Sequence, residues 1–184
     1  GVTHIIRGED HISNTPRQIL LYKALGFKTP QYAHIPLILA PDKSKLSKRH
    51  GAVSLSEYKK EGYLPEAIIN FIALIGWNPG DDREIFARSE LIKEFSLERV
   101  QKGGAVFNIE KLNWLNKEYI KKLDPETLGK CLMEYIPEDW KKVIENNESF
   151  WSKIVNLEKE RINKFSEIEE NVSFFFKLPN YPKE

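Results

Sequence analysis

Two short apolar runs with a capped helix between them constrain the fold of this chain more than any other feature. Residues 2–7 contain the mainly apolar, β-branched stretch Val-Thr-His-Ile-Ile, which predicts a short buried strand. A helix should follow, with Thr15 as its cap and Gly26 as its end. A second run of strand length covers residues 32–40, and Pro36 inside it predicts an edge or bulged strand. This order predicts a βαβ unit of a parallel sheet.

After residue 51 the pattern changes to short helices separated by caps and stops. Gly62 and Gly76 should end the first two of these helices. An α/β beginning followed by a mostly α remainder is therefore the expected fold class. The expected helix caps are Ser54, Ser96, Asn108, Asp124 and Ser166.

The charge balance narrows the classes of function. The chain has 184 residues, with 28 Lys+Arg against 27 Asp+Glu and a formal net charge of +1. This balance excludes the global cationic excess of a chromatin protein or an arginine-rich RNA-binding protein. Any affinity for phosphates must therefore come from a local cluster of cations.

Cysteine usage and hydropathy bear on location and metal binding. The single cysteine, Cys131, cannot form an internal disulfide or a multi-cysteine zinc site. We therefore predict no protein-bound zinc and a reducing, cytoplasmic location. The longest apolar stretch, residues 71–77, is far shorter than the ~18 to 20 residues that a membrane-spanning helix needs. The chain opens at Gly1 and its one methionine is Met133, so we expect a fragment of a longer protein.

Cations gather on the loop of residues 41–51, directly after the second apolar run. Preorganised cations and hydroxyl donors stabilise charge on transferring phosphoryl oxygens, so this loop is predicted to face phosphates. The alternative is a solvated basic turn, which is what most surface runs of Lys and Arg are. The cations are Lys43, Lys45, Lys48, Arg49 and, when protonated, His50, and the hydroxyl groups are those of Ser44 and Ser47.

The residue order in this loop favours the first interpretation. Lys45-Leu46-Ser47-Lys48-Arg49 is similar to the KMSKS signature of class I aminoacyl-tRNA synthetases, with Leu for Met and Arg for the last Ser. Together with further segments, it resembles the bacterial glutamyl-tRNA synthetase family from residue 1 to about residue 123, and more weakly beyond. Those segments are IRGEDHISNTPRQILLY (6–22), AHIPLI (33–38), GYLPEA (62–67), GW (76–77), EIF (84–86), AVF (105–107) and KLNWLN (111–116).

The resemblance implies three segments. They are the latter part of a Rossmann-type catalytic domain at 1–52, a helical stem-contact region at 53–123 and the start of a helical anticodon-binding domain at 124–184. The family's second signature, His-Ile-Gly-His or similar, does not occur in the sequence. We therefore expect the isolated chain not to activate glutamate at a useful rate.

The resemblance also implies the activity of a glutamate–tRNA ligase. In that reaction L-glutamate and Mg-ATP form glutamyl-adenylate, and the acyl group then moves to the 3′ end of tRNA(Glu). Such chemistry needs positioning and charge stabilisation rather than a protein nucleophile. Lys48 is the expected main catalytic residue, with Lys45 and Ser47 as helpers. Mg²⁺ is expected to arrive with ATP, and the protein is expected to be a monomer.

Further site residues follow from the positions of the family's motifs. Arg7 is implied to bind the glutamate, since an arginine fork suits a carboxylate. The ATP-binding set implied by the resemblance is Lys48, Lys45, Leu46, Ser47, Asp10, His11 and Leu37. The implied tRNA contacts are Lys111, Trp114, Asn116 and Lys117.

Several alternatives stay open at this point. Arg7 could instead form a salt bridge with an acidic neighbour, Glu9 or Asp10, and Trp114 could be core filler. His4 and His34 are expected to be hydrogen-bonded core or rim histidines.

Other functions also compete with the ligase. Competing functions are a glutamyl-Q-type enzyme, a glutaminyl-tRNA synthetase and a noncatalytic RNA-binding module. The segment 9–14 and the helical continuation past Asp124 argue against the glutamyl-Q type.

Overall fold

The computed structural model describes residues 1–47 and 54–177. The chain divides into two compact units, one of residues 1–50 and 72–108 and the other of residues 51–71 and 109–184. The three segments expected from the sequence cut the chain differently, and their boundaries stay a prediction. In the described ranges, no helix is both long and apolar enough to cross a bilayer.

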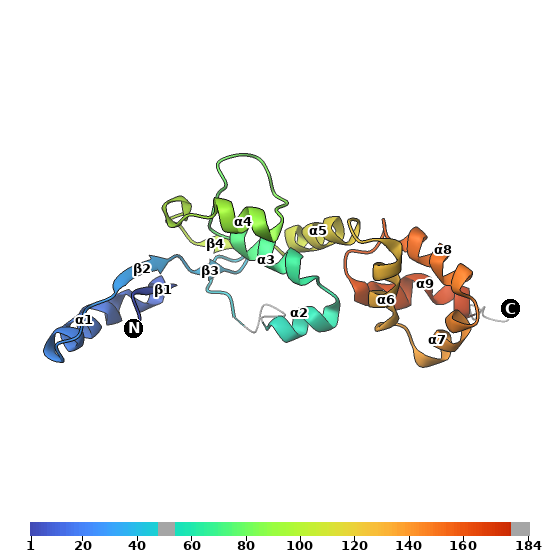
Figure 1. Ribbon diagram of the computed structural model, residues 1–184, viewed down its shortest axis with the longest axis horizontal. Helices are drawn as coiled ribbons and strands as arrows, with labels where there is room; N and C mark the ends of the chain where they lie inside the picture. The colour runs from blue at the N-terminus through green and yellow to red at the C-terminus, as the bar shows by residue number, and fades with distance from the viewer. Residues whose placement is uncertain (48–53, 178–184) are drawn as a thin grey trace. The chain divides into compact units, whose positions relative to one another are not determined.

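The elements alternate between strands and helices only in the first part of the chain (Figure 1). An α/β beginning followed by mostly helical structure is therefore confirmed. In chain order the elements are β1 (His4–Gly8), η1 (Glu9–Asn14), α1 (Thr15–Ala24), β2 (Gln31–Ile35), β3 (Ile38–Leu39), α2 (Leu55–Glu61), α3 (Pro65–Leu74), α4 (Arg88–Glu94), η3 (Leu97–Arg99), β4 (Ala105–Val106), α5 (Ile109–Ile120), α6 (Pro125–Met133), α7 (Glu138–Glu145), α8 (Glu148–Glu158), η4 (Phe165–Glu167) and α9 (Ile168–Phe176).

The predicted βαβ unit is confirmed in the first unit. β1 and β2 pair in parallel, with His4 opposite Gln31 and Arg7 opposite His34, and α1 connects them. Gly26 ends the α1 region with a φ of +69°, a left-handed conformation that costs glycine little. The unit therefore follows from the local signals in the first 35 residues.

The predicted start of α1 needs a correction. Residues 9–14 form a 3-10 helix, η1, that runs directly into α1. Asn14 already has helical dihedrals, φ −84° and ψ −22°, so Thr15 stands inside the helical run rather than at its cap. The Thr15 hydroxyl is thereby released from capping and bonds elsewhere.

The second apolar run is split at Pro36 into β2 and β3. Proline has no N–H to give to a ladder, and the chain leaves the first sheet there. β3 instead pairs in parallel with β4, and Phe107 N–H donates to Leu39 O at 2.8 Å. Gly104 lies against this strand so closely that a Cβ would come within 2.8 Å of Leu39 Cδ1.

Helix caps in the second unit largely follow prediction. Ser54 and Glu57 form a reciprocal capping box at the start of α2. Asp124 caps α6 by accepting from Thr127 N–H. Gly62 ends α2 with a φ of +86°, and a Cβ there would come within 2.6 Å of Phe165 Cβ, so both conformation and packing require glycine.

Two expected caps differ from the prediction. Ser96 stands at the N-cap of the short 3-10 turn η3 rather than of an α-helix. Ser166 lies inside η4, and the α-helix that follows begins at Ile168. In both places the chain makes a single 3-10 turn after the extended residue, which short sequence motifs do not separate from the first turn of an α-helix.

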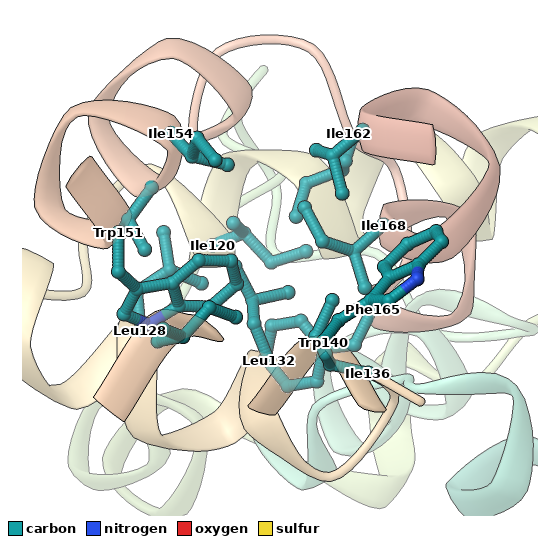
Figure 2. Close-up of a cluster of buried hydrophobic side chains, with 13 residues drawn as sticks. Ile120, Leu128, Leu132, Ile136, Trp140, Trp151, Ile154, Ile162, Phe165 and Ile168 are labelled. Atoms are coloured by element: carbon teal, nitrogen blue, oxygen red, sulfur yellow. The ribbon is translucent and has the colours of Figure 1, made fainter. Parts of the chain in front are cut away.

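The core of the second unit lies among α6, α7, α8 and α9 and the end of α5. Figure 2 shows side chains from these helices meeting in one cluster. Ile120, Leu128 and Ile168 are completely buried there. The Trp140 ring stacks on Phe176 with centroids 4.6 Å apart, whereas Phe174 and Phe175 of the same helix remain exposed.

Candidate functional site

Two predicted ATP-binding residues, Asp10 and Lys45, come together although 35 positions separate them. Asp10 lies in η1, directly beyond the carboxyl end of β1, and Lys45 forms an antiparallel bridge with Leu39 of β3. Lys45 Nζ donates to Asp10 Oδ2 at 2.8 Å, and both side chains remain exposed. That hydrogen bond holds the pKa of the Asp10 carboxyl below its usual value. The pair occupies the strand ends where open α/β sheets usually meet their ligands.

A tight turn after β3 positions Lys45. Ala40 N–H donates to Ser44 O at 2.8 Å, and Leu46 N–H donates to Ile38 O at 3.0 Å. The Asp42 carboxylate accepts from both the Ser44 N–H, at 2.9 Å, and the Ser44 hydroxyl, at 2.6 Å. These short-range bonds return the chain toward β3 and so direct Lys45 to the end of β1.

The described residues include only part of the segment 45–49, which is similar to the KMSKS signature. Leu46 is half-buried beside β3, and Ser47 is exposed. Lys48, the residue expected to contribute most, lies outside the described residues, as do Arg49 and His50. The role of Lys48 therefore stays a prediction.

Arg7 is held by a hydroxyl and an aromatic ring. Its Nη2 donates to Thr15 Oγ1 at 2.9 Å and makes a longer contact of 3.5 Å to the His11 carbonyl. The guanidinium lies over the Tyr32 ring, 5.3 Å from its centroid. Within the described residues no carboxylate contacts Arg7, so the alternative of an ordinary salt bridge is not what the structure has.

Because Gly8 has no side chain, the side chains of Asp10 and Leu37 can lie close to the end of β1. Leu37 N–H donates to Glu9 Oε1 at 3.2 Å, which ties the segment after β2 to the segment after β1. A Cβ on Gly8 would lie 2.5 Å from Asp10 Oδ1 and 3.9 Å from Leu37 Cδ2. Neither Gly8 nor Glu9 was among the predicted ligand-binding residues. A glycine directly after an apolar strand is the signal that could have identified this close approach.

The three histidines among the described residues differ in burial and in hydrogen-bond partners. His34 is partly buried, and its Nε2 lies 3.0 Å from Thr15 Oγ1. His11 is exposed, and its Nδ1 lies 3.3 Å from the Asn14 amide nitrogen. His4 is exposed, and its ring bonds to Thr3 Oγ1 at 2.9 Å. His34 thus fits the expected rim position, while His4 lies at the surface.

The predicted tRNA contacts on α5 separate into two groups. Lys111, Trp114 and Lys117 follow one another at intervals of three, which puts them on neighbouring faces of the helix. Trp114 is 40% exposed, which fits a surface ring better than core filler. Asn116 is completely buried, so it is removed from the predicted tRNA set.

Asn116 instead joins three backbone groups. Its Oδ1 accepts from Leu64 N–H at 2.8 Å, and its Nδ2 donates to Asn163 O at 2.6 Å and Gly62 O at 3.4 Å. The partners lie about 50 positions away, so no local pattern reveals them. Its spacing of four from the buried Leu112 is the signal that could have placed Asn116 on the core side of α5.

Asn116→Ala is expected to lower the free energy of unfolding by about 2–4 kcal/mol, because it leaves buried backbone groups without partners. Urea unfolding followed by circular dichroism measures the change. The matched control is Asn156→Ala on α8, whose exposed amide donates to Ser152 O within its own helix. The control should stay within about 0.5 kcal/mol. A loss below about 1 kcal/mol for Asn116→Ala would contradict the structural role.

Lys45→Gln is expected to raise the pKa of Asp10 toward its ordinary value, because it removes the cation that stabilises the carboxylate. A carboxyl whose pKa is lowered in the folded state stabilises the fold above its ordinary pKa, and this stabilisation is lost as the pH falls through the lowered value. The Asp10 carboxyl carbon resonance, followed by NMR from about pH 6 downward, measures the titration. The neighbouring Lys43→Gln serves as control, and equal shifts in both variants would refute the specific pairing.

A metal site would need several ligating side chains close together. In residues 1–47 and 54–177, no group of three or more His, Cys, Asp or Glu side chains is arranged to hold a metal ion. Burial and the nearby Glu134 raise the pKa of the Cys131 thiol.

Comparison with known proteins identifies relatives for nearly the whole chain. The family described as tRNA synthetases class I (E and Q), catalytic domain, matches residues 1–114. A glutamate–tRNA ligase of Natranaerobius thermophilus is 46% identical over 178 residues, covering 95% of this chain and 36% of the relative. One from Desulforamulus reducens is 47% identical over 180 residues, covering 96% and 37%.

Two solved structures are similar to nearly the whole chain. The crystal structure of a glutamate tRNA ligase from Elizabethkingia meningosepticum in complex with its amino acid has a TM-score of 0.79 and 38% identity, covering 99% of this chain and 39% of that one. The glutamate-tRNA synthetase of Elizabethkingia anophelis has a TM-score of 0.80 and 38% identity, covering 99% and 40%. The chain thus spans between a third and two-fifths of the length of these relatives.

Proposed function

Because the chain belongs to the family of class I (E and Q) tRNA synthetase catalytic domains, we propose that it is part of a glutamate–tRNA ligase. In the proposed reaction the α-carboxylate of L-glutamate attacks the α-phosphate of Mg-ATP and releases pyrophosphate. The glutamyl group then moves from the adenylate to the 3′-terminal adenosine of tRNA(Glu). This chain would supply cations and positioning groups for both steps.

The juxtaposition of Asp10 and Lys45 is the observation that carries the proposal. Residues that the family motif assigns to ATP meet at the carboxyl ends of β1 and β3, at 2.8 Å. Both are exposed, so an incoming nucleotide can reach them without unfolding the site. Arg7, one strand residue before the end of β1, lies on the same segment as Asp10 and holds no carboxylate in the described residues.

The proposal also covers the contacts to tRNA, the source of Mg²⁺, the oligomeric state and the location of the protein. Lys111, Trp114 and Lys117 on α5 would meet tRNA phosphates and ribose hydroxyls, and the Trp114 ring is exposed enough to stack on a base. Mg²⁺ would arrive with ATP as part of the substrate. The protein would act as a monomer in the cytoplasm, and gel filtration of the full-length protein at micromolar concentration tests the first of these points.

Exchange of radioactive pyrophosphate into ATP tests the proposed activity. The full-length protein should catalyse the exchange with L-glutamate, and added tRNA(Glu) should become charged. L-Glutamine should not replace L-glutamate, which distinguishes the related glutaminyl enzyme. Absence of glutamate-dependent exchange and charging in the full-length protein would favour a noncatalytic RNA-binding module. Charging of a different acceptor nucleotide within tRNA would favour the glutamyl-Q type.

The 184-residue chain by itself is expected to show no exchange above background, because no His-x-Gly-His segment occurs in it. The same assay, run at equal molar concentrations of the chain and of the full-length protein, makes the comparison. Exchange by the chain at a rate within tenfold of the full-length rate would show that the second signature is dispensable.

A further inference from the structure

The Thr15 hydroxyl is a junction of three hydrogen bonds beside Arg7. Arg7 Nη2 lies 2.9 Å from Thr15 Oγ1, and His34 Nε2 lies 3.0 Å from it. Thr15 Oγ1 in turn lies 3.2 Å from the His11 carbonyl oxygen. The three partners come from β1, β2 and η1, so one hydroxyl at the start of α1 joins these three elements.

The donor and acceptor roles in this junction are determined by chemistry. A hydroxyl has one proton and two lone pairs, a guanidinium can only donate and a carbonyl can only accept. Thr15 therefore donates to His11 O and accepts from Arg7. Its second lone pair is left for His34, which must carry a proton on Nε2. All bonding positions of the hydroxyl are filled, and Arg7 Nη2 is held in one place.

Tyr32 fixes the guanidinium from a second direction. Arg7 and His34 are directly opposite in the β1–β2 ladder, and Tyr32 is two residues before His34 on the same face of β2. The Tyr32 and His34 rings stack at 8° with centroids 6.3 Å apart, and the Arg7 guanidinium lies over Tyr32. A ring and a hydroxyl together thus set the plane and the rotation of the guanidinium.

The rest of the guanidinium is left for a ligand. Within the described residues, Arg7 Nε is buried without a hydrogen-bond partner, and Nη1 makes no hydrogen bond. Buried unpaired donors are uncommon in native proteins and call for an explanation. A carboxylate bound at Arg7 would supply the missing acceptor in the form that arginine binds most strongly.

We propose that Thr15 is a positioning residue for substrate recognition: by binding Arg7 Nη2 it presents the remaining guanidinium N–H groups to a carboxylate of glutamate. The inference rests on the proposed function, because it takes glutamate as the ligand of Arg7. Thr15 itself does not touch the substrate in this scheme and acts through Arg7 alone. Its removal should therefore affect glutamate and leave ATP unaffected.

Pyrophosphate exchange by the full-length protein, with either glutamate or ATP varied, tests the proposal. Thr15→Val keeps the shape of the side chain and removes the hydroxyl, so the KM for glutamate should rise about tenfold or more while the KM for ATP stays within about twofold. Thr15→Ser restores the hydroxyl and should return the KM for glutamate to within about threefold of the parent. Thr29→Val, the same substitution in the turn before β2, is the matched control and should change neither constant.

A double-mutant cycle separates positioning from general support. In an Arg7→Ala background, Thr15→Val should have no further effect on the KM for glutamate, because the group through which it acts is gone. An unchanged KM for glutamate in Thr15→Val alone, equal rises for glutamate and ATP, or full additivity with Arg7→Ala would each overturn the proposal. If Thr15→Val fails to fold, Thr15→Ala undergoes the same measurements. A parent protein that shows neither glutamate-dependent exchange nor charging of tRNA(Glu) would overturn the proposed function and this inference together, whereas an active parent with an unaffected variant overturns the inference alone.

Discussion

Lys48→Ala in the full-length protein is expected to slow glutamate-dependent pyrophosphate exchange by about 10²- to 10³-fold, the usual cost of removing one preorganised group that stabilises transition-state charge. Negative charge builds up on the leaving pyrophosphate as the adenylate forms, and a lysine ammonium beside it favours that state over bound ATP. The effect should therefore fall on kcat, with the KM for glutamate changed little. Exchange rates at saturating glutamate and ATP provide the measurement.

Two further variants show whether the effect belongs to Lys48 or to positive charge in general. Lys28→Ala removes an exposed lysine from the turn between α1 and β2 and should leave exchange unchanged. Lys45→Ala should slow exchange less than Lys48→Ala, because the Lys45 ammonium is already paired with the Asp10 carboxylate at 2.8 Å. An exchange rate for Lys48→Ala within twofold of the parent would show that Lys48 is only a solvated surface charge.

The elements that sequence reasoning predicted well are those whose signals lie within one turn of chain. The Ser54–Glu57 capping box, the Asp124 cap and the stops at Gly26 and Gly62 each depend on groups at most four residues apart. The unpaired N–H and C=O groups at a helix end need hydrogen-bond partners close by in the chain. Capping and stop signals therefore predict helix ends correctly in most tertiary settings.

Thr15 and Pro36 show where local reasoning fails. Thr15 has every feature of a cap, with Pro16 after it and Gln18 three residues on, but η1 extends the helix backward and the hydroxyl serves Arg7 instead. Pro36 was expected to make an edge or a bulge, and it separates two strands that belong to different sheets. Both outcomes depend on partners far along the chain, which spacing alone does not identify.

The candidate site was predictable to the extent that a motif assigns residues to a ligand. Asp10 and Lys45 were both assigned to ATP by resemblance, and the structure brings them into contact. The role of Glu9 was missed, and Asn116 was assigned to tRNA instead of to the core of the second unit, because both act through backbone partners 28 to 54 positions away. Polar groups that link distant segments carry no periodic signature, since each is defined by the one place where those segments meet.

Arg7→Ala in the full-length protein is expected to raise the KM for glutamate by about 10- to 100-fold, which corresponds to the loss of one charge-assisted hydrogen-bonded pair with a carboxylate. The KM for ATP should stay within about threefold, because Arg7 contacts neither Asp10 nor Lys45. Pyrophosphate exchange with glutamate varied at saturating ATP measures the first constant, and the converse experiment measures the second.

Arg7→Lys and Arg17→Ala sharpen the interpretation of this result. Lysine keeps the charge but lacks the planar fork and cannot bind Thr15 and a carboxylate in the same geometry, so Arg7→Lys should recover only part of the lost affinity. Arg17, exposed on α1, provides an equal loss of charge without the Thr15 and Tyr32 contacts, and Arg17→Ala should leave both constants unchanged. If Arg7→Ala leaves the KM for glutamate at the parent value, the guanidinium held by Thr15 and Tyr32 is a structural group, and the glutamate carboxylate must be bound by residues elsewhere in the full-length protein.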